Sequence, residues 1–312
     1  MPFKPPAEIA KTAIASGCTK CTTTWDKLLI LAFLAGAYIA FGALLAEIVT
    51  GGISGGFVQT LADKSTQTIA IPTGILKFTT GALFPVGLML VVIGGSELFT
   101  GNCMFAPISW LDKKITLKGF AINWTLVYIG NLIGALFVVY FLAYWSGLFS
   151  SAPFATWAMS VANTKLGLTW DDALLRGIGC NWLVCLAIWL AISSDDIIGK
   201  ILGIWFPIMA FVTIGFEHSV ANMFFIPLGI ALANDSGVVA SSKAVMTNYP
   251  NLGAGLTTDW VHFIVNNLLP VTVGNIIGAA VFVAALYWWV YIRSPLCVTT
   301  TPPSVATATS AK

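Results

Sequence analysis

Glu217 and His218 are the two side chains whose types and placement suggest chemistry. They stand together at the middle of the 34 residues between Lys200 and Asp235, and no other residue in that interval is charged or titratable. An imidazole can take up and release a proton near neutral pH, while a carboxylate accepts hydrogen bonds. The pair therefore predicts a pore or a binding site that holds a proton-carrying group in apolar surroundings.

The element that must position this pair is an unusually long apolar segment. A membrane-spanning helix needs about 20 apolar residues, so residues 201–233 are too long, and too polar at their centre, for one ordinary span. Gly215, Ser219 and Ala221 permit a non-helical crossing, whose freed backbone groups must be satisfied by protein or by a water-filled cavity. The sequence predicts a broken helix with the ionisable pair at its break.

The composition is that of a membrane protein. Of the 312 residues, 57% are hydrophobic and only 9% are charged, and the mean hydropathy is +0.88. A water-soluble core of this size does not need so much apolar sequence. The net charge of +2 and the scattered basic residues argue against a nucleic-acid partner. The expected partner is the lipid bilayer of the cell membrane.

The cysteines and histidines indicate neither a disulfide framework nor an enzyme. Cys18 and Cys21 form a lone C-x-x-C in a polar stretch with no second pair, which disfavours a metal or redox site. The two histidines are not part of an H-E-x-x-H motif, so little is present from which a catalytic centre could be built. The sequence predicts no metal, no cofactor and no enzyme activity.

Six apolar segments organise the chain. Residues 1–27 are predicted as a cytoplasmic tail, residues 28–293 as the six-helix membrane domain, and residues 294–312 as a disordered cytoplasmic tail. The predicted spans are 28–46, 78–111, 116–145, 174–192, 201–233 and 263–292. Glu97 lies inside the second span as Glu217 lies inside the fifth, so both are expected to be broken, and Pro270 predicts a kink in the sixth. Polar loops are expected between the spans, with Lys165 in the loop after the third.

The basic residues predict the orientation. If the N-terminus is cytoplasmic, ten basic residues lie on the inner side and five on the outer side. The inner set is Lys4, Lys11, Lys20, Lys27, Lys113, Lys114, Lys118, Lys200, Arg293 and Lys312, and the outer set is Lys64, Lys77, Lys165, Arg176 and Lys243. Both termini are therefore expected in the cytoplasm.

Two sequence patterns occur twice. The pattern Gly-x-Glu-x4-Asn-x4-Pro is found at residues 95–107 and again at 215–227. Residues 123–135 share Asn, Gly-Asn, Gly and Ala with residues 267–279 at a constant offset of 144. Each half then holds three spans, and an odd number places the halves in opposite orientation, as an inverted 3+3 repeat. The Gly-Asn pattern also suits helix packing alone, because small residues line interhelical contacts.

The repeated motifs resemble those of the formate/nitrite transporter family. The resemblance covers about residues 28–293 and is carried by GGSELFTGN at 94–102, GFEHSVANMF at 215–224, Asn181, and NNLLPVTVGN at 266–275. It implies an all-α membrane protein with six transmembrane helices, an aquaporin-like inverted 3+3 repeat and broken spans 2 and 5. It also implies a homopentamer in which each protomer has its own pore for a small monovalent anion.

The resemblance assigns roles to individual positions. It places His218, Thr100, Lys165, Asn181 and Asn267 on the substrate pathway. It makes hydrophobic constrictions of Phe84, Leu88, Phe99 and Phe211. The repeat itself favours structural roles at the helix breaks for Glu97, Glu217, Asn102 and Asn222, with the acids accepting N–H groups of the interrupted backbone. From the residues alone, His218 can instead bond a freed carbonyl, and Asn181 and Asn267 can bond between helices.

These residue types suit the passage of a small acid. Half-helix N-termini and a lysine at the outer mouth attract an anion, whereas phenylalanine rings have no donors and favour a neutral acid. His218 can resolve this conflict by giving a proton to the anion when the anion is beside it. Formate is favoured, because the N-terminal and first-span sequences are most similar to formate transporters. Nitrite and hydrosulfide are the alternatives, and a neutral-solute channel of aquaporin type is disfavoured because no Asn-Pro-Ala triplet stands at either break.

Overall fold

The protein is mostly helical. The computed structural model describes residues 3–61, 63–246, 249, 252 and 259–293, and within them six helical segments are long and apolar enough to cross a membrane. These segments are Trp25–Ser54, Thr73–Gly94, Leu117–Tyr144, Trp170–Ser193, Ile197–Ile214 and Trp260–Tyr291. This confirms the prediction of six apolar helices. The predicted tail of residues 294–312 lies outside the described residues.

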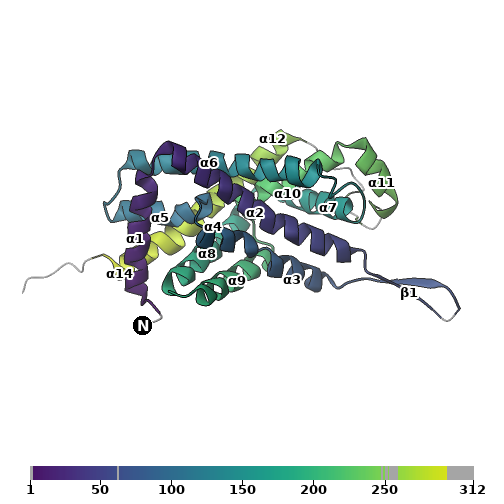
Figure 1. The fold of residues 1–312 in the computed structure, drawn as a ribbon, viewed down its shortest axis with the longest axis horizontal. Coiled ribbons are helices and arrows are strands. Elements are labelled where there is room, and N and C mark those ends of the chain that lie inside the picture. The colour runs from purple at the N-terminus through teal and green to yellow at the C-terminus, as the bar shows by residue number, and fades with distance from the viewer. Residues whose placement is uncertain (1–2, 62, 247–248, 250–251, 253–258, 294–312) are drawn as a thin grey trace, which may run out of the picture.

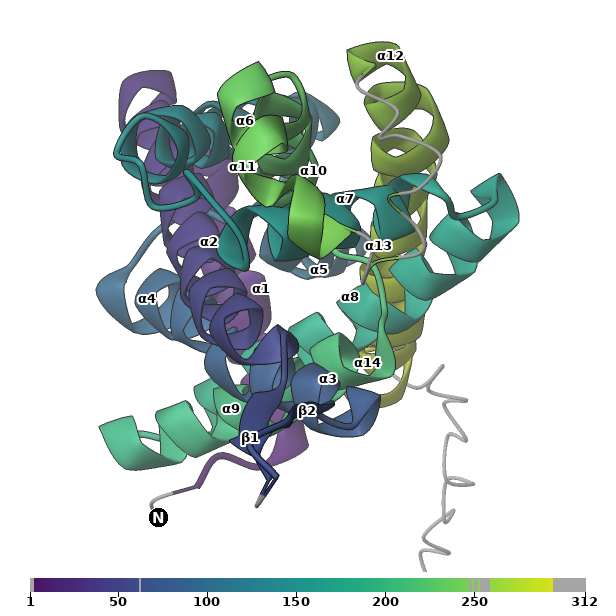
Figure 2. The same cartoon turned by 90° about the vertical axis from the view of Figure 1, so that its right-hand side faces the viewer.

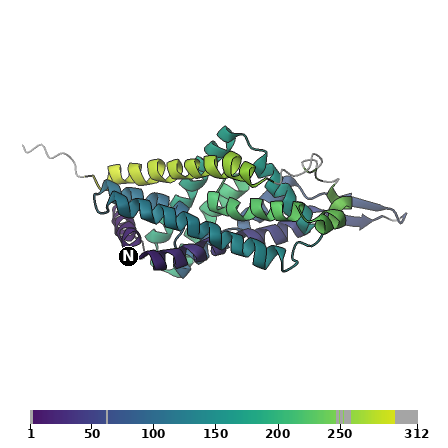
Figure 3. The ribbon, with the colours of Figure 1, turned by 90° about the horizontal axis from the view of Figure 1, so that it is seen from above.

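The spanning segments are built from one or several helices. The first, fourth and fifth are α2 (Trp25–Ser54), α8 (Trp170–Ser193) and α9 (Ile197–Ile214). The second joins α3 (Thr73–Leu83) to α4 (Val86–Gly94), and the third joins α6 (Leu117–Phe137) to the π-helical η1 (Val138–Tyr144). The sixth comprises α12 (Trp260–His262), η3 (Phe263–Leu268), α13 (Leu269–Ala279), η4 (Ala280–Ala285) and α14 (Leu286–Tyr291). Figure 3 shows this last segment running along the long axis of the molecule.

Two further helices follow interruptions in the chain. Helix α4 ends before Gly95, and α5 (Phe99–Leu111) begins four residues later. Helix α9 ends before Gly215, and α10 (Ser219–Ala233) begins after the same interval. The φ angles of Gly95 and Gly215 are +80° and +95°, a left-handed conformation that glycine adopts without a steric penalty. Seen end-on, α2, α6, α8 and α9 spread around α5 (Figure 2).

The N-terminal segment is part of the packed body. Helix α1 (Pro6–Thr22) buries Ile9, Ala10, Ala13 and Ile14 and lies across one end of the bundle (Figure 1). Lys4, which precedes α1, forms an ion pair with Asp195 in the loop after α8, with 2.8 Å between Nζ and Oδ1. The Lys4 ammonium holds the pKa of Asp195 below its ordinary value. Residues 1–27 were predicted as a cytoplasmic tail, and in the structure α1 of this segment packs on α5.

Two expected loops contain regular structure. The loop after the third span holds α7 (Phe154–Leu166), which carries Lys165. Small residues explain its close packing, because a Cβ added at Gly229 of α10 would meet Ala162 of α7. The connection after α2 forms a hairpin of β1 (Phe57–Thr60) and β2 (Thr66–Ile69), whose strands pair antiparallel and are exposed throughout. The hairpin projects from the end opposite α1 (Figure 1), and α11 (Ser236–Met246) follows α10.

Matched glycines bring two helix pairs together. A Cβ at Gly134 of α6 would strike the Phe33 carbonyl of α2, and a Cβ at Gly278 of α13 would strike the Ile178 carbonyl of α8. These contacts correspond under the sequence repeat, because Gly278 follows Gly134 by 144 residues and Ile178 follows Phe33 by 145. The α2–α6 and α8–α13 pairs are therefore packed in the same way.

The sixth segment also has the irregularity that its proline predicts. Residues 263–268 form a π-helical turn immediately before Pro270. Proline lacks an N–H and its ring clashes with the carbonyl four residues earlier, so a wider turn relieves the conflict.

Candidate functional site

The first interruption is held by a ring of four side chains. Glu97 Oε1 accepts from Lys20 Nζ at 2.7 Å, and Glu97 Oε2 accepts from Asn102 Nδ2 at 2.8 Å. The Asn102 amide also donates to Asn123 Oδ1 at 2.9 Å. Asn123 closes the ring by donating to the Lys20 carbonyl at 3.0 Å. Helices α1, α5 and α6 are thereby joined at the break.

The second interruption has the same ring. Glu217 Oε1 accepts from Lys165 Nζ at 2.9 Å, and Glu217 Oε2 accepts from Asn222 Nδ2 at 2.7 Å. Asn222 donates also to Asn267 Oδ1 at 2.8 Å, and Asn267 donates to the Lys165 carbonyl at 3.0 Å. Each lysine corresponds to the other in the repeat, at an offset of 145.

A further asparagine satisfies the backbone of each break. Asn131 Nδ2 donates to the Ala32 and Glu97 carbonyls at 2.7 and 2.9 Å, and its Oδ1 accepts from the Phe99 amide at 2.8 Å. Asn275 makes the matching bonds to the Gly177 and Glu217 carbonyls and to the Ser219 amide. The side chains of Glu97 and Glu217 were expected to accept backbone N–H groups, and they accept lysine and asparagine donors instead.

His218 stands at the N-terminus of α10 and is 3% exposed. Its Nδ1 accepts from the Ala221 amide at 3.0 Å, and its Nε2 lies 2.9 Å from Thr100 Oγ1. Because Nδ1 accepts a backbone hydrogen bond, the bond pattern assigns the hydrogen of the neutral imidazole to Nε2, which donates to Thr100. The predicted histidine and threonine are therefore in direct contact, across the two interruptions.

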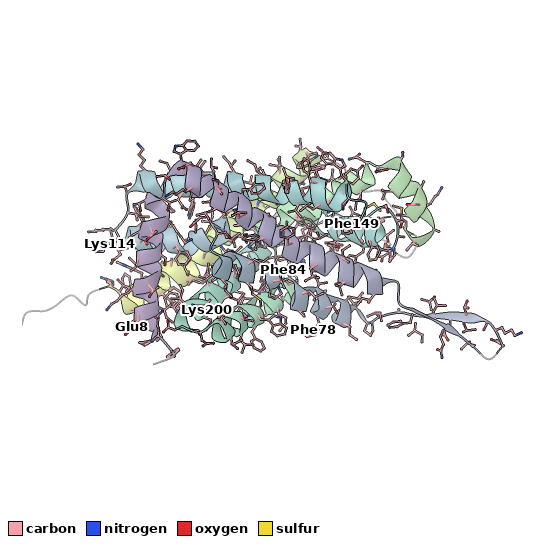
Figure 4. The ribbon with its side chains drawn as sticks, viewed as in Figure 1. Glu8, Phe78, Phe84, Lys114, Phe149 and Lys200 are labelled. Atoms are coloured by element: carbon pink, nitrogen blue, oxygen red, sulfur yellow. The ribbon has the colours of Figure 1, made fainter. Side chains whose placement is uncertain are left out.

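A cavity of about 120 Å³ lies beside His218. We call it the Lys165 cavity. Its wall includes Glu47, Thr80, Phe84, Trp157, Val161, Lys165, Phe211, Val212, Gly215, Phe216, Glu217, His218, Ala221 and Phe225. The Phe84 and Phe211 rings meet edge to face at 5.9 Å, and the Phe211 ring stacks on His218 at 6.0 Å. Phe84 lies near the middle of the long axis (Figure 4). A larger cavity of about 700 Å³ shares Thr80, Lys165 and Glu217 with it and continues past Lys77 and Arg176.

A second cavity of about 230 Å³ lies at the first interruption. We call it the Lys20 cavity. Its wall includes Ser16, Lys20, Val91, Val92, Gly95, Ser96, Glu97, Leu98, Gly101, Asn102, Phe105, Ile188 and Ile192. The repeat relates most of this wall to the Lys165 cavity, and each lysine amine lies 5.3 Å from the matching ring, that of Phe105 or Phe225. Two cavities of the same construction therefore flank the paired interruptions.

The other predicted pathway residues line neither cavity. Asn181 donates to the Thr100 and Asn275 carbonyls at 3.0 and 2.8 Å, so it fixes the backbone that carries Thr100. Asn267 belongs to the Lys165 ring described above. Leu88 is fully buried, and Phe99 packs on Trp124 and Tyr128 beside a separate apolar groove. Constriction by these two residues stays a prediction, as does constriction by Phe84 and Phe211.

Two cavity residues were not singled out from the sequence. Lys20 was counted only as a basic residue. The sequence offset of 144 pairs Lys165 with Cys21, and only the matching bonds of the two lysines in the structure relate Lys165 to Lys20 at an offset of 145. Glu47 was not considered, because the first span was predicted to end at residue 46; α2 continues to Ser54, so Glu47 is an ionisable residue inside a spanning helix. That position is itself a signal of function.

The site can hold an ion or a small polar molecule by hydrogen bonds. Its groups are a lysine, an imidazole, carboxyl groups and aromatic rings. Among the described residues, no group of three or more His, Cys, Asp or Glu is arranged to hold a metal ion. The lysine and the imidazole on these walls offer proton exchange and hydrogen bonding to an anion.

Comparisons with known proteins agree with this geometry. The sequence description of the family "Formate/nitrite transporter" matches residues 7–289. A probable formate transporter of Methanothermobacter thermautotrophicus is 50% identical over 305 residues, covering 93% of this chain and 98% of that protein. The formate channel FocA of Escherichia coli K12 is 35% identical over 293 residues, covering 92% and 94%.

A solved structure is similar over most of the chain. It is a pentameric formate channel with formate bound, and it superposes with a TM-score of 0.69 at 35% identity, covering 86% of this chain and 98% of that one. The fold, the interrupted motifs and the sequence matches agree, and this chain belongs to the formate/nitrite transporter family.

Proposed function

We propose that this protein conducts a small monovalent anion across the cell membrane, with formate as the first candidate substrate. The observation that carries the proposal is the buried contact of His218 with Thr100 beside the cavity that Lys165 lines. The names of the similar proteins, a probable formate transporter and formate channels, support formate. Transport is proposed in place of catalysis because the walls offer binding groups and a proton carrier, and no catalytic motif was found in the sequence.

The proposal includes proton coupling through His218. Phe84 and Phe211 offer no donors, so an anion between their rings is poorly solvated, and a neutral acid passes more easily. For His218 to supply the proton it must first become an imidazolium, whose Nδ1 carries a hydrogen and can no longer accept from the Ala221 amide. An anion beside the ring offsets that lost bond by charge attraction. Protonation is thus expected only while an anion is present.

The proposed architecture is an aquaporin-like inverted 3+3 repeat with spans 2 and 5 broken. The matched rings around Glu97 and Glu217 and the matched glycine contacts support it. Three spans in each half give the halves opposite orientation. The proposed assembly is a homopentamer, by similarity to the solved pentameric channel.

The proposed orientation has both termini in the cytoplasm. The Lys4–Asp195 ion pair and the cluster of Lys11, Lys114 and Ile292 around one surface pocket support grouping the N-terminal segment and the end of α14 on one side. Glu8, Lys114 and Lys200 lie toward that end in Figure 4. Basic residues favour the cytoplasmic side.

Substrate choice is tested by uptake into proteoliposomes. Labelled formate, nitrite, hydrosulfide, acetate and lactate are compared in one reconstituted preparation, and formate is expected to enter fastest. Faster nitrite or hydrosulfide flux would assign the chain to that substrate. Stopped-flow light scattering with sodium formate and with glycerol separates the anion channel from a neutral-solute channel, which selective glycerol flux would favour.

The role of His218 is tested by substitution. His218→Ala is expected to lower formate uptake and to flatten its pH dependence, because the buried proton carrier is lost. Thr100→Val is the matched control that removes the hydrogen-bond partner and keeps the shape of the side chain. An unchanged rate and pH dependence in His218→Ala would rule out proton coupling through this residue.

A further inference from the structure

Glu47 is an ionisable wall residue of the Lys165 cavity to which no role has been assigned so far. It belongs neither to the contact of His218 with Thr100 nor to the hydrogen-bonded ring that contains Lys165 and Glu217. It lies on α2, is 2% exposed, and lines the cavity together with Lys165, Phe211 and His218. Its Oε2 is buried and has no hydrogen-bond partner among the described residues. A buried polar atom without a partner is costly, and its presence calls for an explanation.

The neighbouring polar groups bond to other atoms and not to Glu47 Oε2. Lys165 Nζ donates to Glu217 Oε1 at 2.9 Å, and both nitrogens of His218 are engaged. The Thr80 hydroxyl donates to the Leu76 carbonyl at 2.9 Å, so its hydrogen is already used. The carboxyl of Glu47 is thus left facing the space where an anion would lie.

The repeat shows that the fold does not need a carboxyl here. The Leu31 carbonyl accepts a hydrogen bond from the Glu97 amide, and the Arg176 carbonyl accepts one from the Glu217 amide. Leu31 and Arg176 are therefore equivalent positions, at an offset of 145. The same offset relates Glu47 to Ile192, which lines the Lys20 cavity. The Lys20 cavity thus has an isoleucine at the position where the Lys165 cavity has Glu47, and the hydrogen-bonded ring forms in both. The carboxyl of Glu47 is therefore not needed to hold the helix interruption, which points to a role inside the Lys165 cavity.

The charges of the cavity decide which form of Glu47 is compatible with an anion. The titratable groups that face it are Lys165 on α7 and Glu217 and His218 before α10, and the adjoining larger cavity adds Lys77 of α3, Arg176 of α8 and Tyr249. Lys165 and Glu217 form an ion pair, so their charges cancel. An ionised Glu47 would make the wall net negative and repel an anion, whereas a neutral carboxyl has an O–H to donate.

We propose that Glu47 is an anion-binding residue of the Lys165 cavity, which donates a hydrogen bond to the anion while protonated and closes the cavity to anions when it ionises. This inference rests on the proposed anion transport and adds a second titratable group to the pathway. The proton stays on Glu47 throughout, so the role differs from that of His218, which passes its proton to the substrate. Binding is present at low pH and is lost as the pH rises.

The test compares Glu47→Gln and Glu47→Ile with the parent in full-length protein reconstituted in proteoliposomes. Labelled formate uptake is measured between about pH 5.5 and 8.5, a window in which an exposed glutamate would already be ionised and histidine titrates. The glutamine amide donates a hydrogen bond at every pH, so the ratio of Glu47→Gln to parent uptake is expected to rise with pH. Glu47→Ile places the residue of the Lys20 cavity in this wall, and its uptake at low pH is expected to fall about tenfold, the value of one hydrogen bond to a charged group.

A spectroscopic measurement keeps the inference testable if a variant folds poorly. The infrared difference between the parent and Glu47→Gln near neutral pH is expected to contain the C=O stretch of a protonated carboxyl. Any one of three outcomes would overturn the inference: a Glu47→Gln to parent uptake ratio that stays constant with pH, parent-like uptake by Glu47→Ile, or no carboxyl band. The proposed formate transport by the parent would not be affected. Absence of anion uptake by the parent itself would instead remove the proposed function, and the inference with it.

Discussion

The Lys20 and Lys165 cavities share one frame. In both, a glutamate at the helix break binds a lysine and an asparagine, and a second asparagine ties that lysine's carbonyl to the ring. The lysine side chains are 20% and 15% exposed, and their glutamates 8% and 5%. Because the same network occurs at both interruptions, we assign it a structural role: each interruption frees backbone groups that must be satisfied by hydrogen bonds.

The walls of the two cavities differ where the frame does not constrain them. His218 corresponds to Leu98, and Phe211 to Val91, at an offset of 120. Glu47 corresponds to Ile192, as argued above. At these three positions the Lys165 cavity has two titratable groups and one aromatic ring, and the Lys20 cavity has aliphatic side chains. The comparison teaches that the shared residues hold the interruptions, while the unshared residues are those to which we assign the proposed transport chemistry.

The largest expected effect tests the shared frame. Glu97→Leu and Glu217→Leu each leave a largely buried lysine without its partner, which costs about 3–5 kcal/mol when a buried pair is broken. The two variants are expected to lose similar stability, measured as thermal unfolding of the purified protein in detergent. The double variants Lys20→Met/Glu97→Leu and Lys165→Met/Glu217→Leu are the controls, and they should recover most of the loss because no charge stays unpaired. A large loss in only one half would break the correspondence.

A smaller effect tests the matched helix packing. Gly134→Ala and Gly278→Ala each push a methyl group against a carbonyl of the neighbouring helix, and overpacking of this kind costs about 1–3 kcal/mol. The same unfolding measurement should show similar losses. Gly74→Ala is the control, since a Cβ at Gly74 meets nothing within 4 Å. If Gly74→Ala were as damaging as the other two, backbone contact would not be the cause.

The sequence predicted the parts of this fold that rest on local rules. Six apolar segments followed from length and hydropathy alone. The interruption at Gly215 followed from a polar centre in an overlong apolar run, and the glycine indeed has a left-handed backbone. The contact of His218 with Thr100 was not visible in the sequence, because it joins residues 118 positions apart, and only the family resemblance placed both on one pathway.

The failures have physical causes. Helix α7 was expected to be a loop, because its 13 residues are too few and too polar to show a spanning pattern, and packing on α10 stabilises it. The β1–β2 hairpin was missed because all of its residues are exposed, so no buried periodicity marks it. Glu47 was missed because the first span was predicted as an uncharged run of residues 28–46, whereas the helix continues through this charged residue, which lines a buried cavity.

The third prediction exchanges one wall residue between the cavities. Phe211→Val gives the Lys165 cavity the side chain of Val91 and removes the ring that contacts Phe84 and His218. Acetate exceeds formate by one methyl group, and a pocket discriminates such a group by about tenfold. The ratio of formate to acetate uptake in proteoliposomes is expected to fall by up to that factor. Val91→Phe is the matched variant, which adds a ring to the Lys20 cavity, and a rise of the ratio in that variant without a fall in Phe211→Val would place the selective wall in the Lys20 cavity.

The smallest expected effect probes the Lys20 ring through a neighbouring thiol. Burial and, to a smaller extent, the nearby Glu97 carboxylate raise the pKa of Cys21 to about 11. The raised pKa keeps the thiol neutral at pH 7, with roughly one part in ten thousand as the reactive thiolate. In a background with Cys18 and Cys297 replaced by serine, maleimide labelling of Cys21 should therefore accelerate about tenfold per pH unit between pH 7 and 10.

The same labelling reads the charge of Glu97. Glu97→Gln removes the negative charge and leaves the Lys20 ammonium, which lowers the pKa of Cys21, so labelling at pH 8 should become faster. Leu166→Cys, made in the same background with Cys21 also replaced by serine, puts a thiol at the matched position beside the Lys165 cavity. Leu166 is only 4% exposed, so that thiol should label more slowly than Cys21. If the labelling rate of Cys21 did not change in Glu97→Gln, burial alone would set the reactivity of this thiol. The charge of the Glu97 carboxylate would then have no effect on Cys21.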